Sequence, residues 1–166
     1  VVERPASVAK ELLENALDAG ATEIRVEAEA GGSRLLKISD NGHGMGRDDA
    51  MLAFERHSTS KLRDAEDLAS IQTLGFRGEA LPSIAAVSRL TLVTRDRNSD
   101  SGTVVEINGG RVRRCEDIAA PVGTSIAVAD LFYNVPARKK FLRSEQTELA
   151  HIGTLPPPGD LVKKLE

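Results

Sequence analysis

Apolar residues recur at helical spacing between Pro5 and Ala19, and this pattern predicts an amphipathic helix over that stretch. At about 100° per residue, one side of the helix carries the apolar residues Val8, Ala9, Leu12, Leu13, Ala16, Leu17 and Ala19. Proline is tolerated in a first helical turn, and Gly20 is a typical residue just beyond a helix end. A polar strip runs along one edge of the apolar side and consists of Glu11, Asn15 and Asp18.

The pattern then changes to the period of two that is typical of half-buried strands. Between residues 22 and 30, Ile24, Val26 and Ala28 alternate with charged residues. Further strands are predicted at 34–40, 89–94, 103–108, 111–115 and 124–129, and further helices at 47–55, 79–87 and 137–152. The run from Asn108 to Gly110 is a hairpin turn signal. This order of elements predicts an α+β fold with a mixed sheet and helices on one face.

The chain has 166 residues, which suits one domain with one sizeable core. We place this domain at residues 1–152, because the tail at 153–166 carries consecutive prolines between glycines and is typical of a linker. The net charge of −3 gives no global attraction to nucleic acid or membrane, so any basic site must be local. The single cysteine, Cys115, excludes an internal disulfide framework and a multi-cysteine zinc site. Without a long apolar run or a signal peptide, we expect no membrane partner and a cytoplasmic protein, or a nuclear one in a eukaryote.

Candidate chemistry begins in the glycine loop that follows the second strand. Asp40 lies at the strand end, where its carboxylate can accept a hydrogen bond from an exocyclic amine such as that of adenine, and Gly42, Gly44 and Gly46 follow at alternate positions. An ordinary strand-to-helix turn has the same composition. A dinucleotide-binding fingerprint fails on spacing because its third glycine would fall at Arg47, and no P-loop motif occurs in the chain.

Two further stretches carry polar groups that suit a phosphorylated ligand. The stretch LGFRGEAL, residues 74–81, places glycines before a predicted helix, where backbone N–H groups can bind an anion. The preceding loop supplies candidate phosphate partners, and the whole segment is either a glycine-hinged lid or a solvated loop with a helix cap. On the first helix, Glu11 and Asn15 lie one turn apart and can converge on a partly sheltered site, unless the polar edge simply meets solvent.

Other polar residues carry weaker signals. We interpret His43 and His151 as ordinary surface residues. A basic patch near the end of the predicted domain is either a DNA phosphate contact or a solvated helix face, and it consists of Arg138, Lys139, Lys140 and Arg143.

In this order, ELLEN, DNGHGMG and LGFRGEAL resemble the motifs of the GHKL ATPase superfamily. The longer strings RPASVAKELLENALDAGAT, RHSTSKL, LGFRGEALPSIAAVSRLTL and LFYNVPARKKFL resemble the MutL family of DNA mismatch repair proteins, from Val1 to about Ile152. The resemblance implies a two-layer α/β sandwich with a mixed, mostly antiparallel sheet. It also implies Mg²⁺-dependent ATP binding and hydrolysis, with closure of a lid over the nucleotide as a conformational switch.

The resemblance also assigns roles to single residues. Glu11 would be the general base for the attacking water, Asn15 would bind Mg²⁺, and Asp40 would bind the adenine amine. The adenine pocket would further include Gly42, Gly44 and Thr124. The lid over the phosphates would include Thr59, Ser60, Lys61, Gly75, Phe76, Arg77 and Gly78.

By the same resemblance, the partners would be ATP, a mismatch recognition protein, other repair factors and DNA. The family's N-terminal arm and second domain match nothing in this sequence, so we expect a monomeric chain, although the full-length family members dimerise. An ATP-binding switch with negligible turnover is therefore an alternative to an active ATPase. A kinase-like phosphotransfer domain is disfavoured, because no phosphoacceptor histidine motif is present and Glu11 suits water activation.

Overall fold

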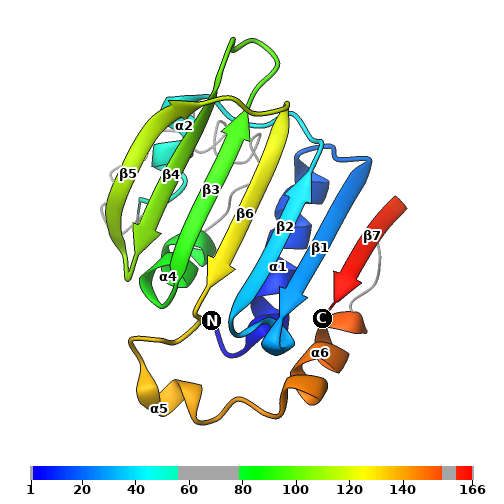
Figure 1. The fold of residues 1–166 in the computed structure, drawn as a ribbon. Helices are drawn as coiled ribbons and strands as arrows, with labels where there is room; N and C mark the ends of the chain where they lie inside the picture. Colours follow the sequence, from blue (N-terminus) through cyan, green and yellow to red (C-terminus); the bar gives the residue numbers. More distant parts are fainter. Residues whose placement is uncertain (1, 56–78, 155–159, 166) are drawn as a thin grey trace.

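A computed structural model describes residues 2–55 and 79–154 and the backbone of residues 160–165. Its described strands form one seven-stranded sheet in the order β5-β4-β3-β6-β2-β1-β7 (Figure 1). The strands are β1 (Glu23–Glu29), β2 (Leu35–Asp40), β3 (Arg89–Arg95), β4 (Gly102–Asn108), β5 (Arg111–Ile118), β6 (Gly123–Ala129) and β7 (Asp160–Leu165). The helices are α1 (Pro5–Asp18), α2 (Arg47–Leu52), α4 (Ala80–Ala86), α5 (Pro136–Lys139), α6 (Glu145–Gly153) and the short 3₁₀ helix η1 (Ala30–Gly32).

Neighbouring strands pair antiparallel, except that β7 runs parallel to β1. The centre of the sheet is β6, which pairs with β3 on one side and β2 on the other. This arrangement confirms the predicted α+β fold with a mixed, mostly antiparallel sheet. The predicted hairpin turn between β4 and β5 is also present, with Gly109 at φ +55° and Gly110 at φ +85°.

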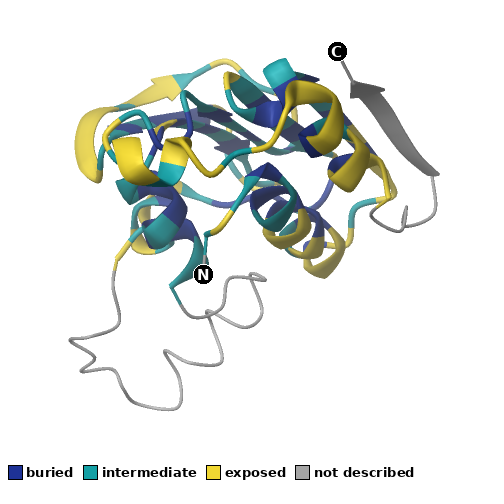
Figure 2. Cartoon of the chain, turned by 90° about the horizontal axis from the view of Figure 1, so that it is seen from below, coloured by how far each residue is buried: buried dark blue, intermediate teal, exposed yellow. Residues whose placement is uncertain are grey.

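The core lies between one face of the sheet and the helices that cover it (Figures 1 and 2). The apolar side of α1 supplies much of it, with Val8, Ala9 and Ala16 almost fully buried. One predicted core residue of this helix is placed differently, since the side chain of Leu17 is 46% exposed. Leu17 lies at the edge of the apolar side in the last turn of α1, next to the exposed Asp18.

Glycines after α1 and after β1 meet two different requirements, a positive φ angle at the first and close packing at the second. Gly20 ends α1 at φ +76°, and the N–H of Ala21 donates to the carbonyl of Ala16 across this turn. In η1, a Cβ on Gly31 would lie 2.7 Å from the carbonyl oxygen of Glu145, at the start of α6. Glycine at this position therefore lets α6 pack against η1.

The C-terminal part differs from the sequence prediction in its elements. The predicted single helix at 137–152 is broken into α5 and α6, because Ser144 begins a new helix by accepting a hydrogen bond from the N–H of Thr147 at 3.2 Å. The carboxylate of Glu148, which is buried, also accepts the N–H of Arg143 at 2.7 Å and fixes this break.

Within the tail predicted as a linker, Asp160–Leu165 forms β7 against β1. The domain boundary at residue 152 stays a prediction.

Candidate functional site

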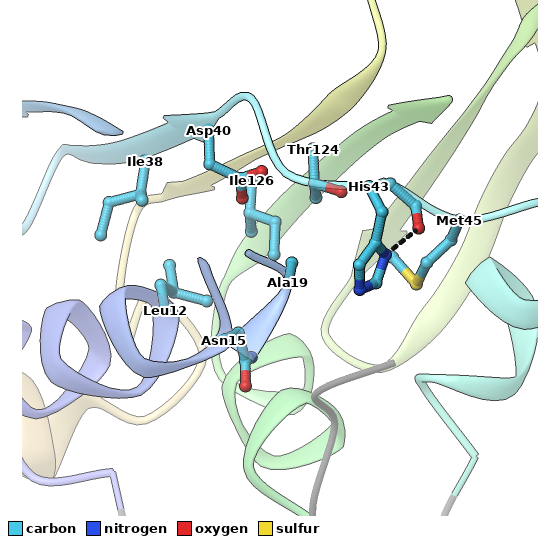
Figure 3. Close-up of a pocket in the computed structure, with 10 residues that line it drawn as sticks. Leu12, Asn15, Ala19, Ile38, Asp40, His43, Met45, Thr124 and Ile126 are labelled. Atoms are coloured by element: carbon cyan, nitrogen blue, oxygen red, sulfur yellow. Dashed lines mark hydrogen bonds between the residues drawn. The ribbon is translucent and has the colours of Figure 1, made fainter. Parts of the chain in front are cut away.

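A pocket lies between α1, the end of β2, the glycine loop and the start of β6 (Figure 3). Its lining is largely apolar and consists of Leu12, Asn15, Ala19, Ile38, Asp40, His43, Gly44, Met45, Thr124 and Ile126. The enclosed volume is about 20 Å³, which is room for about one water molecule. A larger ligand bound here must displace lining side chains or extend beyond these residues.

Asp40 supplies the charged group of this pocket. It ends β2, and its Oδ1 accepts the N–H of Gly42 at 2.8 Å. Burial raises the pKa of Asp40 above its ordinary value of 3.8, while hydrogen bonds from the backbone N–H groups of Gly42 and Thr124 and the charge of His43 partly oppose this rise. A half-buried carboxylate held in this way offers acceptor oxygens in an apolar slot.

Thr124 lies beside Asp40 at the same end of the pocket, opposite Asn15 (Figure 3). Its hydroxyl is 2.8 Å from the hydroxyl of Thr94, which is 1% exposed on β3. The Thr94 hydroxyl also accepts the N–H of Met45 at 3.0 Å and donates to the carbonyl of Gly123 at 3.1 Å. Sequence reasoning missed Thr94, since only its pairing with Thr124 across β3 and β6 brings it to the site.

The glycines near the pocket are required by the backbone around them. Gly44 has φ +68°, and a Cβ on it would lie 1.9 Å from the carbonyl oxygen of Arg95. Gly44 lines the pocket, and the absence of a side chain on it leaves room for the backbone of β3. A Cβ on Gly42 would likewise lie 2.6 Å from the carbonyl oxygen of Ala19, at the end of α1.

The first half of the glycine loop is fixed by hydrogen bonds to α1 and β1. The Asn41 Oδ1 accepts the N–H groups of Thr22 at 2.8 Å and Glu23 at 2.9 Å, and so ties the loop to the start of β1. The N–H of His43 donates to the carbonyl of Ala19 at 3.0 Å. His43 is not the ordinary surface residue predicted from sequence, because it is half-buried and lines the pocket. His151 is exposed, as predicted.

The residues of the polar strip of α1 differ in their position relative to the pocket. Asn15 lines it, whereas Glu11 is exposed and lies one turn earlier in the helix, outside the lining. Within the described part of the chain, no group of three or more His, Cys, Asp or Glu residues could hold a metal ion. The donor set nevertheless fits Mg²⁺ delivered with a nucleotide, since Mg²⁺ keeps several waters and needs only one or two protein oxygens besides phosphates. The Asn15 amide oxygen could be one such ligand.

The structure thus brings Asn15, Asp40, Gly44 and Thr124 together, with Gly42 bonded to Asp40. The predicted lid lies outside the described residues, with all of its named members: Thr59, Ser60, Lys61, Gly75, Phe76, Arg77 and Gly78. The helix expected after the lid is present as α4, which begins at Ala80.

The basic patch lies far from this pocket. Figure 1 shows α5 beyond the end of the sheet that is opposite to the Asp40 end of β2. Lys139, Lys140 and Arg143 are exposed, whereas Arg138 is half-buried with its guanidinium 5.8 Å from the centre of the Phe132 ring. Three of the four residues therefore remain available for contacts with a charged partner.

Comparison with known families decides how this geometry is classified. A family model described as histidine kinase-, DNA gyrase B- and HSP90-like ATPase matches residues 3–131. The chain is a member of this GHKL ATPase family. The predicted family membership is therefore confirmed.

Within the GHKL family, the chain is similar to DNA mismatch repair proteins MutL. It is 71% identical over 155 residues to that of Solibacter usitatus and 66% identical over 155 residues to that of Koribacter versatilis. Each match covers 93% of this chain and 24% of the relative, so the chain spans about a quarter of their length. The resemblance to the N-terminal GHKL ATPase region of MutL, predicted from the sequence, is thus confirmed.

Solved structures of this group share the fold. The Aquifex aeolicus MutL ATPase domain complexed with ADP matches with a TM-score of 0.72 and 34% identity, over 92% of this chain and 52% of that one. The N-terminal domain of a DNA repair protein matches with a TM-score of 0.77 and 30% identity, over 93% of this chain and 45% of that one.

No helix among the described residues is long and apolar enough to cross a bilayer.

Proposed function

We propose that this chain binds ATP with Mg²⁺ and hydrolyses it, as the ATPase module of a MutL-type DNA mismatch repair protein. The observation that carries the proposal is the convergence of Asn15, Asp40 and Thr124, from α1, β2 and β6, on one apolar pocket. The family match and the similarity to a MutL ATPase domain complexed with ADP support the same ligand class.

The base of the nucleotide would enter at the Asp40 end of the pocket, with lining side chains displaced to make room for it. The apolar side chains of Leu12, Ile38 and Ile126 can cover the faces of a flat ring, while the Asp40 carboxylate accepts from an exocyclic amine. Burial in this slot strengthens a hydrogen bond to the carboxylate, because less water competes for it. Adenine carries such an amine, as do cytosine and guanine, and the similarity to an ATPase domain complexed with ADP favours adenine among them.

The phosphate end of the site involves α1. We assign Asn15 to the Mg²⁺, which would neutralise charge on the phosphates and stabilise the charge that develops during hydrolysis. Glu11 is assigned to orienting and deprotonating the attacking water, because it lies one turn from Asn15 on the same helix edge. Closure of residues 56–78 over the phosphates belongs to this proposal through the family resemblance alone.

A second candidate function is an ATP-binding switch with negligible turnover. It is favoured by the position of Glu11, which is exposed and does not line the pocket. The two functions share the same binding site and differ only in hydrolysis. In either case we infer that mismatch repair proteins and DNA are partners, with Lys139, Lys140 and Arg143 as exposed candidates for contacts with DNA phosphates.

The test is ATP binding and phosphate release by this chain, each measured with and without Mg²⁺. Binding that strengthens with Mg²⁺, together with steady phosphate release, supports the ATPase. Binding without phosphate release supports the switch. The absence of any ATP binding to the folded protein at millimolar concentrations would contradict both functions.

A further inference from the structure

We infer that Thr94, buried on β3, is a positioning residue that makes the pocket selective for a base with an exocyclic amine, through the direction in which it holds the Thr124 hydroxyl. The inference rests on the proposed nucleotide binding and deepens it. Thr94 does not line the pocket, whereas Thr124 does. The two hydroxyl oxygens are 2.8 Å apart.

The direction follows from counting protons in the Thr94 network. A hydroxyl has one proton to donate and two lone pairs to accept with. The N–H of Met45 can only donate, so it uses one lone pair of Thr94, at 3.0 Å. The carbonyl of Gly123 can only accept, so the Thr94 proton is directed to that oxygen, at 3.1 Å. All three bonds form together only if Thr124 donates the remaining one, between the two threonine hydroxyls.

This assignment fixes what the pocket offers a ligand. The Thr124 proton is directed toward Thr94, so the Thr124 hydroxyl presents only lone pairs to the pocket. Asp40 beside it is also an acceptor when ionised, with backbone N–H groups of Gly42 and Thr124 already bonded to it. The polar end of the pocket therefore presents neighbouring acceptors. An amine with two N–H groups complements them, whether directly or through a bridging water.

A carbonyl oxygen at the same position of the base is rejected by this arrangement. The Asp40 carboxylate and the Thr124 oxygen are both acceptors, so neither can form a hydrogen bond with a carbonyl oxygen of the base. An unpaired polar group in a water-poor site is costly. If Thr94 loses its hydroxyl, Thr124 can rotate and donate its proton into the pocket, and this would satisfy a carbonyl. Selectivity between an amine and a carbonyl thus depends on a side chain that does not touch the ligand.

The experiment compares ATP with inosine triphosphate, whose base has a carbonyl in place of the amine and an N1–H donor in place of the N1 acceptor. Because this N1–H is the same in every comparison, the quantity interpreted is the change of selectivity between variants. Dissociation constants for both are measured by calorimetry for the parent chain and for Thr94→Val, which keeps the shape of the side chain and removes the hydroxyl. The dissociation constant for inosine triphosphate divided by that for ATP is the selectivity ratio. This ratio should be about five- to tenfold lower in Thr94→Val than in the parent, which corresponds to one net hydrogen bond. Thr94→Ser restores the hydroxyl and should keep the parent ratio.

Thr103→Val is the matched control. Thr103 is opposite Thr94 across β3 and β4, is 5% exposed and does not line the pocket. Its ratio should equal that of the parent. Thr124→Val, at a half-buried position, removes the acceptor itself and should lower the ratio as well, even if Thr94→Val fails to fold.

The outcomes separate this inference from the proposed function. If the parent binds neither nucleotide, the proposed function fails and the inference with it. If the parent prefers ATP but neither Thr94→Val nor Thr124→Val changes the ratio, only the role of the threonine pair is overturned. A ratio that falls equally in Thr103→Val would show a general packing effect and would also overturn it.

Discussion

Replacing Asp40 with asparagine changes the polar end of the pocket with little change in shape. In the parent, Asp40 accepts the N–H of Gly42 at 2.8 Å and a second N–H from Thr124. An asparagine has one acceptor oxygen, and its other terminal atom is a donor. Because that oxygen is needed by the backbone N–H groups, the amide NH₂ would face the ligand, where an adenine amine also presents donors.

The size of the effect follows from the hydrogen bond that is lost. A hydrogen bond to a charged group contributes about 1.5–3 kcal/mol. At 1.4 kcal/mol per tenfold change in the dissociation constant, Asp40→Asn should weaken binding of ADP by about tenfold to a hundredfold. The fold should be retained, because burial raises the pKa of Asp40 and the loss of a desolvated charge removes a cost.

The assay is calorimetric titration with ADP, with circular dichroism to verify folding. Asp96→Asn is the matched control: it removes the same charge from a loop carboxylate that accepts the N–H of Asn98 at 2.9 Å and does not line the pocket. That control should bind ADP within about twofold of the parent. A folded Asp40→Asn variant that binds ADP as tightly as the parent would refute the assignment of Asp40 to the base.

Glu11→Gln should slow phosphate release by about 10²–10⁴-fold and leave ADP binding unchanged; unchanged turnover in a steady-state assay would remove Glu11 from catalysis. Gly44→Ala should lower the free energy of unfolding in urea by at least about 2 kcal/mol more than Gly20→Ala, because a Cβ meets Arg95 at the first position and open space at the second; equal losses would contradict this account of the loop. The raised folded-state pKa of Asp40 means that its contribution to stability is fully present below pH 3.8 and is lost as the pH rises through the folded-state pKa. The unfolding free energy of the parent minus that of Asp40→Asn should therefore fall as the pH increases above 3.8, and a rise would reverse the inferred direction of the pKa shift.

Local pattern was sufficient for much of the fold. Helical spacing in α1 and alternation in β1 are set by residues close together in the chain, and both elements form within one residue of the predicted bounds. The break between α5 and α6 could not be predicted in the same way. It depends on Glu148 folding back to Arg143 and on contacts of α6 with η1 that only the tertiary structure supplies.

The site shows the same division. Asp40 at a strand end and Asn15 on a helix edge carry local signals, which is why motif and spacing could select them as candidates, and both line the pocket. Thr94 carries no local signal, since its neighbours are those of an ordinary buried strand and its partners come from β6 and the glycine loop. The need for glycine at position 44 could not be predicted either, because the carbonyl oxygen that leaves no room for a Cβ there belongs to Arg95 on β3, far away in the sequence.

The most direct test of the central claim is the response of individual methyl groups to ADP in an NMR titration of this chain. Leu12, Ile38 and Ile126 line the pocket, whereas Leu90 and Ile107 are equally buried and do not line it. The account predicts that the methyl signals of the lining residues shift in a saturable way as ADP is added, and that those of Leu90 and Ile107 stay in place. Saturable shifts confined to residues away from the pocket, or none at millimolar ADP with the protein folded, would contradict it.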